Sequence, residues 1–218
     1  EIPLRLVGSE MCIRDRYYVQ KEKKRLYFRK STPAKKIQKY YRALSMEQDR
    51  RSPHHYFNSV KEVTGKVFVD VGCAEGYSSL EIIEEAKHVY LFEQDEQWLE
   101  AIRATFEPWQ DKVTIIQKYV SDHNSSREQT LDDFFNNQTD EHLFLKMDIE
   151  GAERHALTGC KNLFQNCQKL DFAICTYHLR DDEEVISTFL NKHNCAYINQ
   201  KGFFRHRIRS VVMRGSKK

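Results

Sequence analysis

Apolar residues follow two different periods along this chain of 218 residues, and the two periods alternate from about residue 67 onward. Unbroken apolar runs of strand length occur in KVFVDVG, VYLFE, KVTIIQKYV, HLFLKMD and KLDFAICTY. Between these runs, apolar residues recur every three or four positions, as in residues 78–87 and 98–106, which is the spacing of a buried helix face. Strands alternating with helices predict a mostly parallel sheet, covered on both faces, with ligands at the carboxyl ends of its strands.

The two ends of the chain follow other patterns. CAYIN and RIRSVVM predict a final antiparallel pair of strands near the C-terminus. YYVQKEKKRLYFRKSTPAKKIQKYYRALS interleaves basic residues with aromatic rings, and Pro33 divides it into two segments that we expect to be short helices. We therefore expect a basic helical arm over residues 17–66 and one α/β domain over residues 67–218.

The arm ends in the segment SPHHYF, which contains His54, His55 and Tyr56. This segment lies just before the first predicted strand. A lid-like segment over a cofactor or acceptor is one interpretation, and an exposed turn explains the same residues equally well.

Charge is divided between the arm and the domain. Residues 17–66 hold 14 Lys or Arg against 4 Asp or Glu, whereas residues 67–218 hold 18 against 25. A basic aromatic arm can follow phosphate backbones or lie on an anionic membrane surface. It can equally pack its rings on the domain and leave its charges in solvent.

Residues 1–16, EIPLRLVGSEMCIRDR, show neither period. Residues 6–15 back-translate to CTC GTG GGC TCG GAG ATG TGT ATA AGA GAC, which resembles a transposase-type sequencing adapter. We therefore interpret residues 1–16 as translated adapter, expect them to be disordered, and leave them out of the fold. A natural flexible N-terminus is the alternative.

Cysteine usage indicates a reducing compartment. With residues 1–16 set aside, five cysteines remain, and none of them forms a CxxC pair. We interpret them as reduced, buried, small hydrophobic residues in a cytoplasmic protein. The chain shows neither an apolar run of membrane-spanning length nor a signal-peptide pattern.

The first predicted strand leads into DVGCAEGYSS, where Asp70, Gly72 and Gly76 precede a helix. A tight glycine turn lets the backbone approach a ligand at a helix N-terminus. Glu93 ends the next strand, 21 residues after Gly72, which is close to the spacing at which an acid reaches ribose hydroxyls. The chain lacks G-x-G-x-x-G at this place, and an acid at Asp70 suits a cationic ligand, such as the amino group of S-adenosylmethionine, better than a pyrophosphate.

A wider set of motifs follows in order over about residues 50–213: FVDVGCAEGYSSL, LFEQD, VSD, TLDDF, LKMDIEGAERHALTG and a late YH. Together they resemble class I S-adenosylmethionine-dependent methyltransferases, and more narrowly the FkbM family, for which KMDIEGAE with an upstream TLDDF is the specific signature. The resemblance implies a Rossmann-like fold whose seven-stranded, mostly parallel sheet has its last strand antiparallel. It also implies methylation of a hydroxyl on a saccharide, glycan or glycosylated metabolite.

The same resemblance assigns the cofactor, S-adenosyl-L-methionine, to particular residues. Asp70, Gly72 and Gly76 would line its methionine part, Glu93 would take the ribose, and Asp122 would lie near the adenine amino group. Ala74 stands where many methyltransferases have a middle glycine.

Methyl transfer to a hydroxyl needs alignment and a group that takes the proton. His178, at the end of the fifth strand, is the first candidate base because its ordinary pKa is near neutrality. Asp148 is the second, as a base or as a clamp for the acceptor, and Glu150 and Glu153 are further candidates that helix capping explains equally well. A divalent ion at Asp148 would be another way to polarise the hydroxyl, but acids this close in sequence do not predict a metal site.

Two other functions remain open at this point. The basic arm also suits an RNA methyltransferase, although the acidic domain and the lack of an Asn-Pro-Pro-Tyr motif argue against nucleic acid. A nucleoside-binding module without turnover is the non-enzymatic alternative. For the enzyme, the arm suggests a site of action at the inner membrane face, where glycans are assembled.

Overall fold

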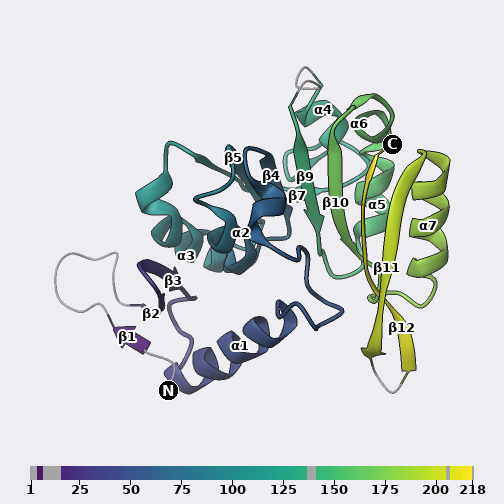
Figure 1. Ribbon diagram of the computed structural model, residues 1–218. Helices are drawn as coiled ribbons and strands as arrows, with labels where there is room; N and C mark the ends of the chain where they lie inside the picture. Colours follow the sequence, from purple (N-terminus) through teal and green to yellow (C-terminus); the bar gives the residue numbers. More distant parts are fainter. Residues whose placement is uncertain (1–3, 7–15, 137–140, 205–206, 218) are drawn as a thin grey trace.

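The protein is built around a seven-stranded sheet (Figure 1). The computed structural model describes residues 4–6, 16–136, 141–204 and 207–217. The strand order is β11-β12-β10-β9-β4-β5-β6, and β12 runs antiparallel to both neighbours while the other pairs are parallel. The predicted Rossmann-like α/β fold is thus confirmed, including the antiparallel last strand. The strands are β4 (Val67–Val71), β5 (His88–Phe92), β6 (Val113–Ile116), β9 (Leu143–Met147), β10 (Leu170–Cys175), β11 (Cys195–Phe204) and β12 (Arg207–Lys217).

Helices cover both faces of this sheet. Alternate side chains of β4 enter different cores: Val69 packs in the core that includes α5, α6 and α7 residues, and Phe68 packs in the core that includes α2 and α3 residues. The helices are α2 (Tyr77–Ile82), α3 (Glu96–Phe106), α4 (Leu131–Phe134), α5 (Glu153–Thr158), α6 (Lys161–Asn166) and α7 (Asp182–Lys192), with 3-10 turns η1 (Val60–Val63) and η2 (Glu107–Trp109) and a small strand pair β7 (Tyr119–Val120) and β8 (Glu128–Gln129).

The order of the strands fixes where a ligand can bind. From β4 the chain runs outward to β5 and β6 and then returns to β9 on the other side of β4. The connections that follow β4 and β9 therefore diverge, and the carboxyl ends of these two strands border the topological switch point, where open α/β sheets bind ligands.

The N-terminal arm differs from the prediction. Before Pro33 it forms a hairpin of β2 (Tyr17–Lys21) and β3 (Lys24–Tyr27), and the predicted first helix is wrong. Its register opposes Val19 to Leu26, and both side chains are buried in the core with α2 and α3 residues, so tertiary packing decides the local structure. The second predicted helix is present as α1 (Ala34–Glu47).

The arm pairs its charges and rings with the domain. Arg29 lies 2.8 Å from Asp95, and Lys24 lies 3.7 Å from Glu84. Tyr40 of α1 stacks on Trp98 of α3, with ring centroids 6.3 Å apart. The opposite charges of arm and domain thus meet within the molecule, whereas the contact of the arm with an anionic membrane stays a prediction.

Part of the stretch that we expected to be disordered is ordered. Residues Leu4–Leu6 form strand β1, which pairs antiparallel with β2, and Arg16 is buried with its guanidinium 2.6 Å from Glu100. The outer edge of β2 offers unpaired backbone groups that any extended segment can complete, whatever its origin. The remainder of the predicted disorder, residues 1–3 and 7–15, lies outside the described residues.

The remaining cysteines and helices agree with the predictions. Within the described part of the chain, five cysteines are free and buried: Cys73, Cys160, Cys167, Cys175 and Cys195. Among the described helices, none combines the length and the apolar character that a membrane span requires.

Candidate functional site

A cavity of about 1220 Å³ lies at the carboxyl edge of the sheet and is bounded on one side by α1. The ends of β4, β5 and β9 supply its floor, and the loop around β7 supplies one wall. In Figure 1, α1 lies below this edge of the domain, joined to it through the hairpin and through the segment that leads to β4. Four of the five residues predicted to bind a cofactor line the cavity: Asp70, Gly72, Glu93 and Asp122. The fifth, Gly76, lies in the same loop as Gly72, immediately before α2.

The glycine loop between β4 and α2 needs its glycines for packing as well as for conformation. Gly72 has φ +77°, and a Cβ there would lie 2.2 Å from the backbone oxygen of Asp148. Gly76 has φ +81° and lies against the ring of Phe106, 2.7 Å from an added Cβ. Ala74 also takes a positive φ of 47°, so the residue in the middle-glycine position keeps the left-handed backbone without glycine.

Glu93 ties the glycine loop to the end of β5. Its carboxylate accepts hydrogen bonds from the backbone N–H of Ala74 at 3.0 Å and of Gln94 and Asp95 at 2.8 Å. The predicted ribose acid is therefore fixed in position at the cavity, beside the glycine turn.

Asp122 lies on the wall formed by the loop after β7. Its carboxylate contacts His123 at 2.8 Å and His155 at 3.3 Å, and these hydrogen bonds lower the pKa of Asp122 to about 2. Asp122 lines the same cavity as Glu93, as the predicted adenine and ribose contacts require.

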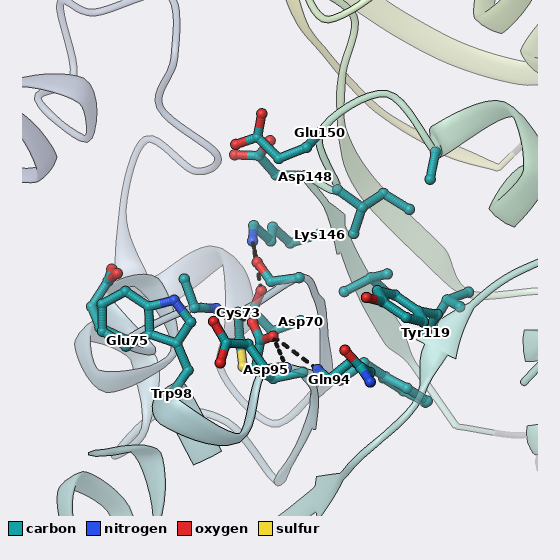
Figure 2. A pocket seen from close by; sticks show the side chains of 18 of the residues that line it. Asp70, Cys73, Glu75, Gln94, Asp95, Trp98, Tyr119, Lys146, Asp148 and Glu150 are labelled. Atoms are coloured by element: carbon teal, nitrogen blue, oxygen red, sulfur yellow. Dashed lines mark hydrogen bonds and ion pairs between the residues drawn. The ribbon is translucent and has the colours of Figure 1, made fainter. Parts of the chain in front are cut away.

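Asp70 is held in a buried ion pair that sequence reasoning missed. Its carboxylate lies 2.8 Å from Lys146 Nζ and accepts a hydrogen bond from Ser79 at 2.6 Å, and Lys146 also donates to the backbone oxygen of Gly72 at 2.7 Å (Figure 2). Burial lowers the pKa of Lys146, but Asp70 and Asp148 outweigh burial and raise it. Because Lys146 already compensates Asp70, the charge of Asp70 alone does not argue for a cationic ligand.

Asp148 and two tyrosines line a further part of the cavity, which adjoins the glycine loop at Gly72. Tyr56 donates its hydroxyl proton to Asp148 Oδ2 at 2.6 Å, and Tyr177 also lines the cavity. In Figure 2, Asp148 and Glu150 are both drawn above Lys146. The structure thus brings the predicted acid Asp148 together with Tyr56 from the lid-like segment, while His55 is buried away from it and contacts Asn58 and Arg214.

His178 lies behind Asp148 and is not among the described residues that line the cavity. Its Nε2 lies 3.4 Å from Asp148 and 3.6 Å from Glu150, and its Nδ1 lies 2.9 Å from the fully buried Glu153. Burial lowers the pKa of His178, but the contact with Glu153 and the charges of Asp148 and Glu150 raise it above its ordinary value overall. The four predicted catalytic candidates therefore form one cluster, with Asp148 on its cavity side.

Glu75 is a second buried acid that the sequence did not single out. It lines the cavity, is 3% exposed, and accepts a hydrogen bond from Tyr40 at 2.8 Å. Burial raises the pKa of Glu75 to about 7 in spite of this hydrogen bond. The sequence does contain a signal for Glu75, since it is a charged residue within the glycine loop, which packs against the sheet. The corresponding signal for Lys146 is a lysine within the apolar run HLFLKMD.

The raised pKa of Glu75 predicts that stability falls as the pH rises. Between about pH 4.5 and 7 the unfolded chain releases this proton while the folded protein keeps it, so unfolding becomes easier by up to about 3 kcal/mol. Thermal unfolding of wild type and Glu75→Gln across this range checks the effect, with the surface variant Glu96→Gln as control. Glu75→Gln should flatten the pH dependence; equal slopes in all three proteins would contradict the assignment.

The fold and this cavity define a class I, Rossmann-like methyltransferase domain. The chain belongs to the methyltransferase FkbM domain family, whose profile matches residues 72–203. This match confirms the resemblance found in the sequence motifs.

Solved structures support the fold. The FkbM methyltransferase from Methylobacillus flagellatus KT is similar, with a TM-score of 0.56 and 19% identity over 69% of this chain and 43% of that chain. The present chain thus spans less than half of that protein. A candidate methyltransferase from Streptococcus mutans in complex with SAH has a TM-score of 0.51 and 16% identity over 72% of this chain and 93% of that chain. No curated protein matches the chain.

Proposed function

We propose that the protein is an S-adenosylmethionine-dependent O-methyltransferase that acts on a hydroxyl of a saccharide, glycan or glycosylated metabolite. One observation carries the proposal: the same cavity is lined by the glycine loop and Glu93, here called its cofactor end, and by Asp148 with Tyr56, here called its acceptor end, and the two parts adjoin where Gly72 meets the backbone of Asp148. A cofactor and an acceptor bound at these two ends would meet above the carboxyl ends of β4 and β9.

The residues of the cofactor end support the binding of S-adenosylmethionine. The glycine loop leaves space for a ligand next to the backbone, and Glu93 and Asp122 offer carboxylates at the two places where ribose and adenine donors are expected. Asp95 adds a further acid to this part of the cavity. Since the cofactor carries a sulfonium and an ammonium group, an excess of carboxylates favours its binding.

The acceptor end matches a polyhydroxylated molecule. The carboxyl groups of Asp148 and Glu47 line this part and can accept hydrogen bonds from the hydroxyls of an acceptor, and the rings of Tyr56 and Tyr177 supply flat apolar surfaces with polar edges. A few convergent polar groups among aromatic side chains are typical of small-molecule sites.

In the proposed reaction, the acceptor oxygen forms a bond to the methyl carbon while the bond from that carbon to sulfur breaks and leaves a neutral thioether. The hydroxyl proton passes to Asp148 and from there to solvent, beside the exposed Glu150. Tyr56 fixes the carboxylate of Asp148 by its 2.6 Å hydrogen bond, which holds the acceptor in line with the methyl group. His178, the first candidate base from the sequence, would act on the acceptor only through Asp148.

Transfer of labelled methyl groups tests the proposed function. Purified protein is incubated with S-adenosyl-[methyl-14C]methionine and either a glycan and glycolipid extract or total RNA from the source cells. We expect label in O-methylated sugars, and a loss of roughly 100-fold or more in Asp148→Asn, because the group that takes the proton is removed. The surface variant Glu96→Gln should transfer methyl groups at the wild-type rate. Label in RNA without label in glycans would overturn the proposed acceptor.

A further inference from the structure

We propose that Asp148, Glu153 and His178 form a binding site for a divalent first-row metal ion such as Mn²⁺. The three side chains come from three elements: Asp148 follows β9, Glu153 begins α5 and His178 follows β10. The sequence did not predict a metal site, because Asp148 and Glu153 are close neighbours in the chain and such acids alone are not diagnostic. The third ligand, His178, comes from the end of another strand, and only the fold brings it to the two acids.

The geometry of the cluster suits a metal ion. One nitrogen of His178 and one carboxylate oxygen from each acid lie within 4.8 Å of one another. An ion with bonds of about 2.1 Å reaches donors up to roughly 4.2 Å apart, so small side-chain rotations complete the coordination of three protein ligands. Asp148 is the member of the cluster that lines the cavity, so it connects the site to the acceptor end.

The cluster also contains buried carboxylate oxygens that accept no hydrogen bond from the described residues. Glu153 is fully buried; one of its oxygens accepts a hydrogen bond from Ile149, and the other has no hydrogen-bond partner among the described residues. Asp148 Oδ1 is likewise buried and accepts no hydrogen bond from the described part of the chain; the nearest group is His178, whose Nε2 lies 3.4 Å away, while His178 Nδ1 lies 2.9 Å from the Glu153 oxygen that accepts from Ile149. Two buried carboxylate oxygens without a donor are costly, and a bound cation would satisfy them together.

The set of donors selects the kind of cation. Two carboxylates and one imidazole form a mixed oxygen and nitrogen site, which suits Mn²⁺, Fe²⁺ or Zn²⁺ better than Ca²⁺, whose ligands are oxygens. Lys146, a buried cation of the same site, is already engaged by Asp70 and Gly72. Lys146 therefore makes no hydrogen bond to the two carboxylate oxygens of the cluster that lack a donor.

The consequence for catalysis rests on the proposed function, whereas metal binding itself does not. An acceptor hydroxyl bound to the cation would become more acidic and would lose its proton more readily as it attacks the methyl group. The cation changes the acidity of the hydroxyl and not the destination of its proton, because Asp148 Oδ2, held by Tyr56, remains on the cavity side.

Electron paramagnetic resonance of Mn²⁺ tests the site directly. Free Mn²⁺ is titrated with full-length protein that has been treated with chelator, and the loss of its six-line signal counts the bound ions. We expect one ion per chain, and binding at least about tenfold weaker in both Glu153→Gln and His178→Gln. His142→Gln is the matched control, because His142 contacts a carboxylate, Asp171, at 2.8 Å outside the cluster; this variant should bind Mn²⁺ as wild type does.

Thermal unfolding with and without Mn²⁺ provides a second measurement. At one Mn²⁺ concentration, the ion should raise the melting temperatures of wild type and His142→Gln by the same amount and that of His178→Gln by less. Lack of Mn²⁺ binding by wild type, or equal binding in all variants, would overturn the metal site and would mean that a proton on His178 is the only charge that the cluster takes. S-adenosylmethionine binding, measured in the same samples, separates this failure from a failure of the proposed function.

Discussion

Replacing Lys146 with methionine is expected to lower the free energy of unfolding by about 3–5 kcal/mol, because the substitution leaves a buried carboxylate without its partner. Asp70 is 1% exposed, and Ser79 would remain its one hydrogen-bond donor among the described side chains. Asp70 and Lys146 also stand opposite each other in the register of β4 and β9, so the pair joins the two strands that border the cavity. Urea denaturation followed by circular dichroism measures the loss.

A less buried ion pair provides the control for Lys146. Lys66 lies 2.5 Å from Asp171, and their side chains are 17% and 24% exposed. Lys66→Met should cost only about 1 kcal/mol, since solvent and His142 remain available to Asp171. Adding Asp70→Asn to Lys146→Met should recover part of the stability, because it removes the unpaired charge. If Lys146→Met and Lys66→Met lowered the free energy of unfolding by the same amount, the buried ion pair would contribute no more to stability than the less buried one.

Replacing Gly72 with alanine is expected to disrupt both the stability and the cofactor end of the cavity. A positive φ costs an alanine about 1–2 kcal/mol, and the added Cβ would also lie 2.2 Å from the backbone oxygen of Asp148 and 2.6 Å from Ile149. The loop and the residues after β9 must then move apart, which displaces Asp148. We expect a total loss of more than about 2 kcal/mol and at least tenfold weaker binding of S-adenosylmethionine.

Gly65 distinguishes the cost of a positive φ from the cost of the steric clash at Gly72. It has φ +71°, but an added Cβ would meet no atom within 4 Å. Gly65→Ala should therefore show only the conformational cost and bind the cofactor as wild type does. If Gly72→Ala were no more destabilised than Gly65→Ala, the close approach of the glycine loop to Asp148 would not matter for the site.

The sheet could be predicted from the sequence because each strand and helix carries its own period. Both faces of β4 are buried, which produces the continuous apolar run, and α3 shows a helical stripe. The hairpin before Pro33 could not be predicted in this way. Its sequence lacks the regular alternation of apolar and polar residues that is typical of strands. The positions of Val19 and Leu26 depend on contacts with residues of α2 and α3, which lie far away in the sequence.

Site residues that lie close together in the sequence could be predicted, whereas contacts between residues far apart in the sequence could not. Gly72, Gly76 and Glu93 belong to one strand-turn-helix unit and its neighbour, so spacing alone points to them. The ion pair of Asp70 with Lys146 depends on the register of two strands, and the contact of Tyr56 with Asp148 joins residues 92 positions apart. Charged residues within two apolar runs were the available signal for the ion pair, because a buried charge needs a partner.

Calorimetric titration of the purified chain with S-adenosylmethionine tests the central claim most directly, which is that the cavity at the switch point is a cofactor site. We predict one binding site per chain, and at least tenfold weaker binding in Glu93→Ala, since losing the charged hydrogen bonds proposed between Glu93 and the ribose would cost more than about 1.4 kcal/mol. Gly65→Ala should bind as wild type does. Absence of binding to the folded wild-type protein, or unchanged affinity in Glu93→Ala, would contradict the account.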